Sequence, residues 1–149
     1  MAYVPADARW FLAQLVMEIR VAGCKRNIVH VNYVLIGARN PEDAYAKAMH
    51  LGKQSRLEPY LNPKGQRVTN RFLGLRQLDV IHDDLEHGCE IMYREMLRVS
   101  PKGLRRLVRK KSELEAFMPI SNGRPGRPDY ASKEIMDKVH EALSRRKKP

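Results

Sequence analysis

Cysteine is scarce in this sequence of 149 residues, in which Cys24 and Cys89 are the only examples. Two cysteines cannot supply the several bridges of a small secreted scaffold, so a disulfide scaffold is excluded. No stretch approaches the roughly 20 apolar residues of a membrane-spanning helix. A secretory signal is also not seen, because the start lacks a basic region and Gln14 and Glu18 interrupt the apolar run behind it. We therefore expect a cytoplasmic protein without a membrane role.

Acidic residues are few in the last third of the chain. Residues 1–97 hold 13 Lys and Arg against 11 Asp and Glu, whereas residues 98–149 hold 15 against 6. Almost all of the formal net charge of +11 therefore lies beyond residue 97. A positive segment of this kind is typical of a surface that binds a polyanion such as DNA or RNA. The hydrophobic fraction of 43% still suffices for one packed domain.

Two strand patterns open the chain. From Trp10 to Val21 the apolar residues fall mainly on one parity, while Gln14 and Glu18 fall on the other. This period of two predicts a strand with one buried face and one solvent-exposed face. The short polar segment 23–27 then predicts a hairpin connection to an antiparallel second strand over residues 28–38.

The clearest helix signal begins at Asn40. Asn40 can cap a helix, and Pro41 suits the first helical position. Asp43 and Lys47 are spaced for an ion pair one turn apart, and Gly52 is the expected end of the helix. Small residues on the apolar face would let the helix lie close to a sheet. The residues of that face are Ala44, Ala48 and Leu51, joined by Tyr45 and Met49.

Strand patterns return after the helix. Asn62–Gly65 has the composition of a tight turn, and Gly74 is a plausible place for a β-bulge. The expected strands cover residues 57–61, 68–81 and 89–99, with a turn over residues 83–88 before the last. The fold class is therefore α+β, with a mainly antiparallel sheet in the order β-β-α-β-β-β and one principal helix packed on it.

The remainder of the chain differs in kind from this domain, which spans residues 1–99. A basic amphipathic helix is expected over residues 100–118, followed by a linker rich in Gly, Arg and Pro over residues 119–131. A C-terminal amphipathic helix with a basic end is expected over residues 132–149. The protein is thus a folded body with a basic helical extension.

Positive side chains recur one helical turn apart in the extension. Arg105 and Arg109 are four residues apart. Arg106 and Lys110 repeat that spacing. Like charges so placed repel by a few tenths of a kcal/mol per pair, unless an anion lies against them. A phosphate backbone would supply that anion, with an affinity that falls as salt rises.

Two glutamates allow a purely structural interpretation of the same stripe. Glu113 can partly neutralise Arg109, and Glu115 can do the same for Lys111. A solvating or partner-binding extension therefore stays open beside contact with nucleic acid of little sequence preference. The candidate nucleic-acid contacts are Lys102, Arg105, Arg106, Arg109, Lys110, Arg124 and Arg127.

The last helix offers a function of another class. Its apolar residues form a narrow seam behind the linker, which could dock into a protein partner or pair with its own copy. The candidate partner-binding residues are Ile135, Met136, Val139 and Leu143. A protein-interaction or inhibitor module is therefore the alternative function.

Catalysis has no positive support in the sequence. His82–Cys89 gathers two imidazoles, three carboxylates and a thiol, which are metal-ligating groups. The same stretch has the composition of a hairpin turn, and it lacks the spacing of recognised metal motifs. We expect a turn there, with a metal or acid–base site as the weaker alternative. No cofactor motif is present, so the protein is expected not to be an enzyme.

Several short stretches between Trp10 and Glu95 match a known pattern. They are Trp10-Phe11-Leu12-Ala13, Ala38-Arg39-Asn40-Pro41-Glu42-Asp43-Ala44, Tyr60-Leu61-Asn62 with Gly65 and Val68, Gly74-Leu75, and Asp84-Leu85-Glu86-His87-Gly88-Cys89-Glu90-Ile91. In these the chain resembles a bacterial family catalogued as domain of unknown function 4288. The resemblance implies a compact α+β domain from a bacterium or phage, and it implies no catalytic residues.

A second resemblance lies in the linker. Gly123–Pro128 is similar to the Arg-Gly-Arg-Pro centre of AT-hook peptides, which lie in the minor groove of A·T-rich DNA. Arg127 matches that centre, whereas Pro125 stands in place of its first arginine and the paired arginine is displaced to Arg124. The resemblance implies contact of these arginines with a groove or with phosphates.

Overall fold

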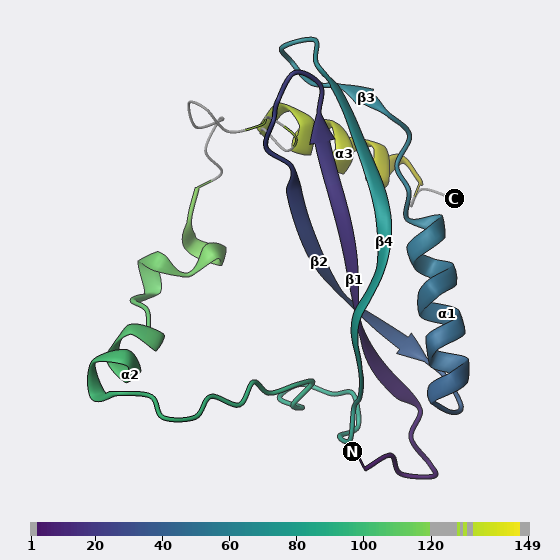
Figure 1. The fold of residues 1–149 in the computed structure, drawn as a ribbon, viewed down its shortest axis with the longest axis vertical. Helices are drawn as coiled ribbons and strands as arrows, with labels where there is room; N and C mark the ends of the chain where they lie inside the picture. Colours follow the sequence, from purple (N-terminus) through teal and green to yellow (C-terminus); the bar gives the residue numbers. More distant parts are fainter. Residues whose placement is uncertain (1–2, 120–127, 129, 131–132, 147–149) are drawn as a thin grey trace. The chain divides into compact units, whose positions relative to one another are not determined.

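The computed structural model describes residues 3–119, 128, 130 and 133–146. Its elements in chain order are β1 (Trp10–Val21), β2 (Ile28–Gly37), α1 (Pro41–Gln54), β3 (Tyr60–Leu61), β4 (Arg67–Val80), α2 (Pro101–Leu107), the 3-10 turns η1 (Lys111–Glu113) and η2 (Glu115–Phe117), and α3 (Lys133–Arg146) (Figure 1). The strands form one antiparallel sheet in the order β2-β1-β4-β3. The α+β class and the principal helix on the sheet are confirmed.

Strand β1 is the centre of the fold, because it pairs with β2 on one side and with β4 on the other. Its hairpin with β2 is confirmed, with Val16 opposite Val31. The expectation of one solvent-exposed face is wrong at Gln14 and Glu18, which are only 6% and 7% exposed. A central strand has neighbours on both sides, so polar residues in its middle are buried as well. The alternation of apolar and polar residues within one strand cannot show whether that strand lies in the centre of a sheet or at its edge.

Helix α1 begins where the sequence predicts. The Asn40 Oδ1 accepts a hydrogen bond from the Asp43 backbone N–H at 2.8 Å, which caps the first turn. The expected ion pair is formed as well, with 3.2 Å between Lys47 Nζ and Asp43 Oδ2. Ala44 and Ala48 are fully buried and pack with the sheet residues that form the core. The N-terminal capping and the close helix–sheet contact are therefore confirmed.

The end and the outer face of α1 differ from the expectation. Gly52 does not end the helix, which continues to Gln54. Instead Gly52 is buried against the ring of Phe72, and a Cβ added there would lie 2.3 Å from the nearest ring carbon. Tyr45 and Leu51 are 52% and 38% exposed rather than packed. Helix α1 lies so close to the sheet that only its row of small residues is buried.

Strand β4 follows the predicted pattern, whereas β3 is limited to Tyr60–Leu61 and residues 57–59 of the expected strand are not in the sheet. Asn62–Gly65 forms the turn, closed by a bond from the Gly65 N–H to the Asn62 carbonyl at 2.9 Å. The pairing of β4 with β1 shifts register twice, on either side of the step that pairs Gly74 with Val16. Gly74 has φ of 144°, a conformation that favours glycine. The predicted bulge is therefore confirmed.

The strand expected over residues 89–99 is not formed, since the described chain contains no strand after Val80. The turn before it is present, with the Cys89 N–H bonded to the Glu86 carbonyl at 3.1 Å. Ile91 and Tyr93 are 48% and 75% exposed. Alternation makes a strand only where a neighbouring strand takes up its hydrogen bonds, and here none does.

The helix expected over residues 100–118 is much shorter. Ser100 caps it, with its Oγ accepting from the Gly103 N–H at 3.1 Å, but α2 ends at Leu107 and Val108 is extended. The two 3-10 turns follow. No residue of α2 is buried, and a short helix without a buried face is marginal in water. The repulsion between like charges that a longer helix would bring together favours the same outcome.

The described residues divide into two compact units. One contains residues 3–92 with residues 128 and 130, and the other contains residues 93–119 with residues 133–146. The continuous part of the first unit runs to Met92, and residues 93–99 of the expected domain belong to the second unit. Within the described ranges, no helix has both the length and the apolar character that crossing a bilayer requires.

Candidate nucleic-acid interface

Five of the seven candidate nucleic-acid contacts lie in the described part of the chain. Three of them are on α2, and two follow it before η1; in sequence order they are Lys102, Arg105, Arg106, Arg109 and Lys110. We call these five residues the basic segment. All five are exposed. Because α2 ends at Leu107, they do not form the continuous helical stripe that was expected. Arg124 and Arg127 lie outside the described residues.

The basic segment has no internal counter-charge. Among the residues that the structure describes, the ion pairs all lie elsewhere in the chain. Glu113 does not pair with Arg109: its Oε2 accepts instead from the Lys110 backbone N–H at 2.8 Å. Lys111 does not pair with Glu115 and lies 5.1 Å from the centre of the Phe117 ring. The internal neutralisation on which the purely structural interpretation depends is therefore not seen in the described chain.

Helix α3 shows the opposite arrangement. Lys138 pairs with Glu134 at 3.3 Å, and Arg145 pairs with Glu141, in each case across one helical turn. Residues 93–119 carry eight Lys and Arg against three Glu, and none of these charges forms a described ion pair. In the part of the extension that the structure describes, the uncompensated positive charge is thus greater around α2 than on α3.

The apolar side chains near the basic segment are exposed too. Leu104, Leu107 and Val108 are 54%, 53% and 80% exposed, and Phe117 is 56% exposed. No residue of α2, η1 or η2 is buried. The described part of this unit therefore offers a bare surface that is both cationic and apolar.

The seam of α3 lies in the same unit. Met136, Val139 and Leu143 are 43%, 44% and 52% exposed. Ile135 is half-buried and takes part in a contact within the chain. The spacing of Ile135, Val139 and Leu143 places them on one face of the helix, as predicted. These residues are thus available in part for a partner.

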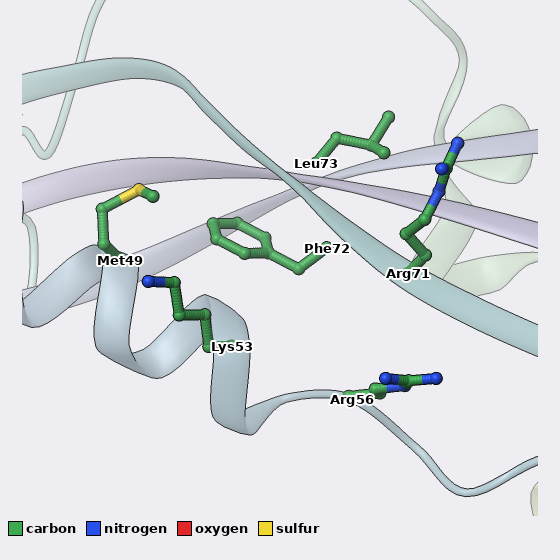
Figure 2. A pocket seen from close by; sticks show the side chains of 6 residues that line it. All are labelled: Met49, Lys53, Arg56, Arg71, Phe72 and Leu73. Atoms are coloured by element: carbon green, nitrogen blue, oxygen red, sulfur yellow. The ribbon is translucent and has the colours of Figure 1, made fainter.

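A hollow of about 440 Å³ on the folded unit was missed by sequence reasoning. Its lining comes from the end of α1, the loop after it and the middle of β4 (Figure 2): the residues are Met49, Lys53, Arg56, Arg71, Phe72 and Leu73. Three of the six are cations and none is an acid. These residues are separated in the sequence and form no linear motif, so only the packing of α1 against β4 brings them together.

The hollow is organised around Phe72. Its ring points toward α1 and packs on Gly52, while Arg71 and Leu73 leave the other side of β4 (Figure 2). The guanidinium of Arg71 is held by Glu18, with 2.8 Å between Arg71 Nη2 and Glu18 Oε1. Lys53 and Arg56 are exposed and form no ion pair with any described residue. The hollow thus combines a partly buried ring with two cations that have no described counter-charge.

Glu18 is the most strongly perturbed carboxylate in the described structure. A hydrogen bond of 2.8 Å from Asn27 is the main reason that its pKa lies at about 2, and bonds from Arg20 and Arg71 lower it further. These favourable bonds outweigh burial, which acts in the opposite direction. Glu18 therefore stays ionised and holds the two arginines. Its carboxylate is already bonded to side chains of the same chain.

The stretch His82–Cys89 behaves as a turn. Asp83 Oδ2 accepts from the Glu90 backbone N–H at 3.1 Å, and His82 stacks on Tyr3 with 6.5 Å between ring centres. Within the described ranges, no three His, Cys, Asp or Glu residues lie close enough together to hold a metal ion. The turn interpretation is therefore the one that the geometry favours.

The folded unit is similar to a known protein family. A family model described as "Domain of unknown function (DUF4288)" matches residues 10–93, which cover the sheet, α1 and the turn after β4. No curated protein and no solved structure matches the chain. The basic segment and α3 lie beyond the matched residues. Since the match spans more than half of the sequence, the chain belongs to the family of this domain of unknown function, DUF4288.

Proposed function

We propose that the protein is a non-enzymatic binding module that contacts nucleic acid through its basic segment, with little sequence preference. The observation that carries this proposal is the set of five exposed cations between Lys102 and Lys110 that have no counter-charge among the described residues. Phosphates of DNA or RNA would supply that charge. Contacts of this kind position a protein on the backbone and carry little sequence information.

The hollow on the folded unit supports the same function. Lys53 and Arg56 form no described ion pair and can meet phosphates, and the Phe72 ring that lines the hollow can contact an unpaired base. The hollow would therefore add a second, weaker contact for single-stranded nucleic acid. Its cations are fewer than those of the basic segment, so we expect the segment to dominate the affinity.

Fluorescence anisotropy with a labelled single-stranded 20-mer at several salt concentrations tests the proposal. Five phosphate contacts predict a slope of log K against log salt of about −3.5 for a single strand and about −4.5 for a duplex. For the single strand this slope is a loss of about 130-fold in affinity between 50 and 200 mM salt. Changing all five cations of the basic segment to Gln should remove most of this slope.

A matched control removes the same number of charges elsewhere. Its five substitutions to Gln are at Lys25, Arg39, Lys64, Lys138 and Arg145, all exposed and outside both the basic segment and the hollow. The control should bind nearly as well as the parent protein. The proposal fails if the parent protein does not bind at 50 mM salt, or if the two variants lose affinity equally.

A protein-interaction or inhibitor module is the second candidate, favoured by the exposed seam of α3. The double variant Val139→Gln, Leu143→Gln removes apolar surface without touching a cation. Under this second function it should abolish binding to a protein partner. Under the nucleic-acid function it should leave the salt-dependent affinity for the 20-mer unchanged.

A further inference from the structure

The outer edge of β2 has no strand partner. The sheet order β2-β1-β4-β3 places β2 at one margin, and among the described strands its ten residues pair with β1 alone (Figure 1). No other strand of the described chain lies on its far side. The outward N–H and C=O groups of such a strand can accept another strand. At the end of β2 the Gly37 carbonyl already accepts a hydrogen bond from Lys47 Nζ at 2.8 Å, so the edge that stays open in the described chain is Ile28–Ile36.

This edge also lacks the features that normally prevent pairing. Natural edge strands carry charges, prolines or bulges, or are kept short. Ile28–Gly37 contains no Asp, Glu, Lys, Arg or Pro, and its pairing with β1 runs without a register shift. The opposite margin is different: β4 carries Arg67, Arg71 and Arg76, shifts register twice and is covered at one end by β3. The margin at β4 is therefore protected along its length, whereas β2 is protected only at its end, where Lys47 binds the Gly37 carbonyl.

The side chains of β2 also favour pairing with another strand. Ile36 lies on the core side of the strand and is buried. On the other parity Val29, Tyr33 and Leu35 are 51%, 56% and 42% exposed. Val31 belongs to the same parity. The strand therefore presents an uncharged edge together with a row of apolar side chains on one face.

We propose that β2 pairs with β2 of a second copy of this chain, antiparallel and about a two-fold axis at Asn32. In this register Val31 faces Tyr33 of the second copy, and Val29 faces Leu35. The apolar rows of both copies then lie on one face of a continuous sheet, in cross-strand pairs of the kind that stabilise sheets. Nearly the whole strand is used, from Ile28 to Ile36.

The absence of charge is the reason that a second copy fits. The chain carries a net charge of +11, so two copies repel each other over most surfaces. A strand without Asp, Glu, Lys or Arg is a place where they can meet without direct repulsion. A two-fold contact is also self-complementary, so a single edge serves both partners.

Sedimentation equilibrium of the nuclease-treated full chain, between 1 and 100 µM, tests the proposal. The parent protein should show a concentration-dependent dimer. The double variant Val29→Lys, Leu35→Lys places lysine opposite lysine across the axis, so its association constant should fall by more than about 100-fold. The variant Val29→Glu, Leu35→Glu should be monomeric for the same reason. An equal mixture of the two variants should form a heterodimer.

Controls separate this interface from others. Tyr45→Lys changes an exposed apolar residue of α1 that does not border β2, and it should leave the dimer intact. Val139→Gln, Leu143→Gln tests pairing through α3 and should also leave it intact. Circular dichroism checks that each variant is folded. The proposal is overturned by a monomeric parent protein at 100 µM, by a dimer that tolerates both charged β2 variants, or by folded variants of opposite charge that fail to pair.

Discussion

Gly52 tests the close contact between α1 and the sheet. A Cβ at this position would lie 2.3, 2.4 and 2.5 Å from three carbons of the Phe72 ring. Ordinary carbon contacts are about 3.5–4.0 Å, so the ring would have to move by more than about 1 Å. Overpacking of this kind costs about 1–3 kcal/mol. Alanine gains up to about 1 kcal/mol over glycine in a helix. We therefore expect Gly52→Ala to lower the free energy of unfolding by about 1 kcal/mol.

Urea unfolding followed by circular dichroism measures this change, provided that the slope of the transition is the same in all variants. Ala46→Gly, at an exposed position of the same helix, measures the glycine-to-alanine difference without the contact. In the Phe72→Leu background the shorter side chain should make Gly52→Ala neutral or stabilising, and the double-mutant cycle isolates the coupling. If Gly52→Ala instead stabilises the parent protein by about 1 kcal/mol, the ring does not lie against the helix as described.

Two further predictions concern stability. Glu18 has a pKa lowered from 4.5 to about 2, so its contribution to stability is complete above pH 4.5 and is lost as the pH falls toward 2. The difference in urea midpoint between the parent protein and Glu18→Gln should therefore shrink over that range; a constant difference would contradict the assignment. Asn40→Ala should cost about 1 kcal/mol in the same assay by removing the cap of α1, whereas Asn40→Asp should keep it.

Three surfaces of different character follow from this structure. The basic segment is bare and cationic, the hollow adds cations around an aromatic ring, and the outer edge of β2 is uncharged. The matched variants above change one surface at a time. A dimer through β2 would bring two basic segments into one particle, so loss of the dimer should weaken binding to a long polyanion more than binding to a short one.

Local chemistry determined much of the domain. The Asn40-Pro41 start of α1, the turn at Asn62–Gly65 and the bulge near Gly74 rest on backbone preferences of single residues, which act whatever lies around them. The hairpin of the first two strands follows from alternation over many residues, so it too could be predicted. The positive charge of the extension is a matter of composition and needed no structure.

Only the tertiary structure decided the rest. Glu18 is buried because β1 became a central strand, and Gly52 became a contact rather than a helix end because Phe72 reaches it. The hollow joins Lys53 to Arg71 from separate elements. The strand expected from Cys89 and the long basic helix were not formed, because a strand needs a neighbour and a short helix needs a buried face. Strand pairing and helix packing depend on residues that are distant in the sequence, so a local sequence pattern cannot predict them.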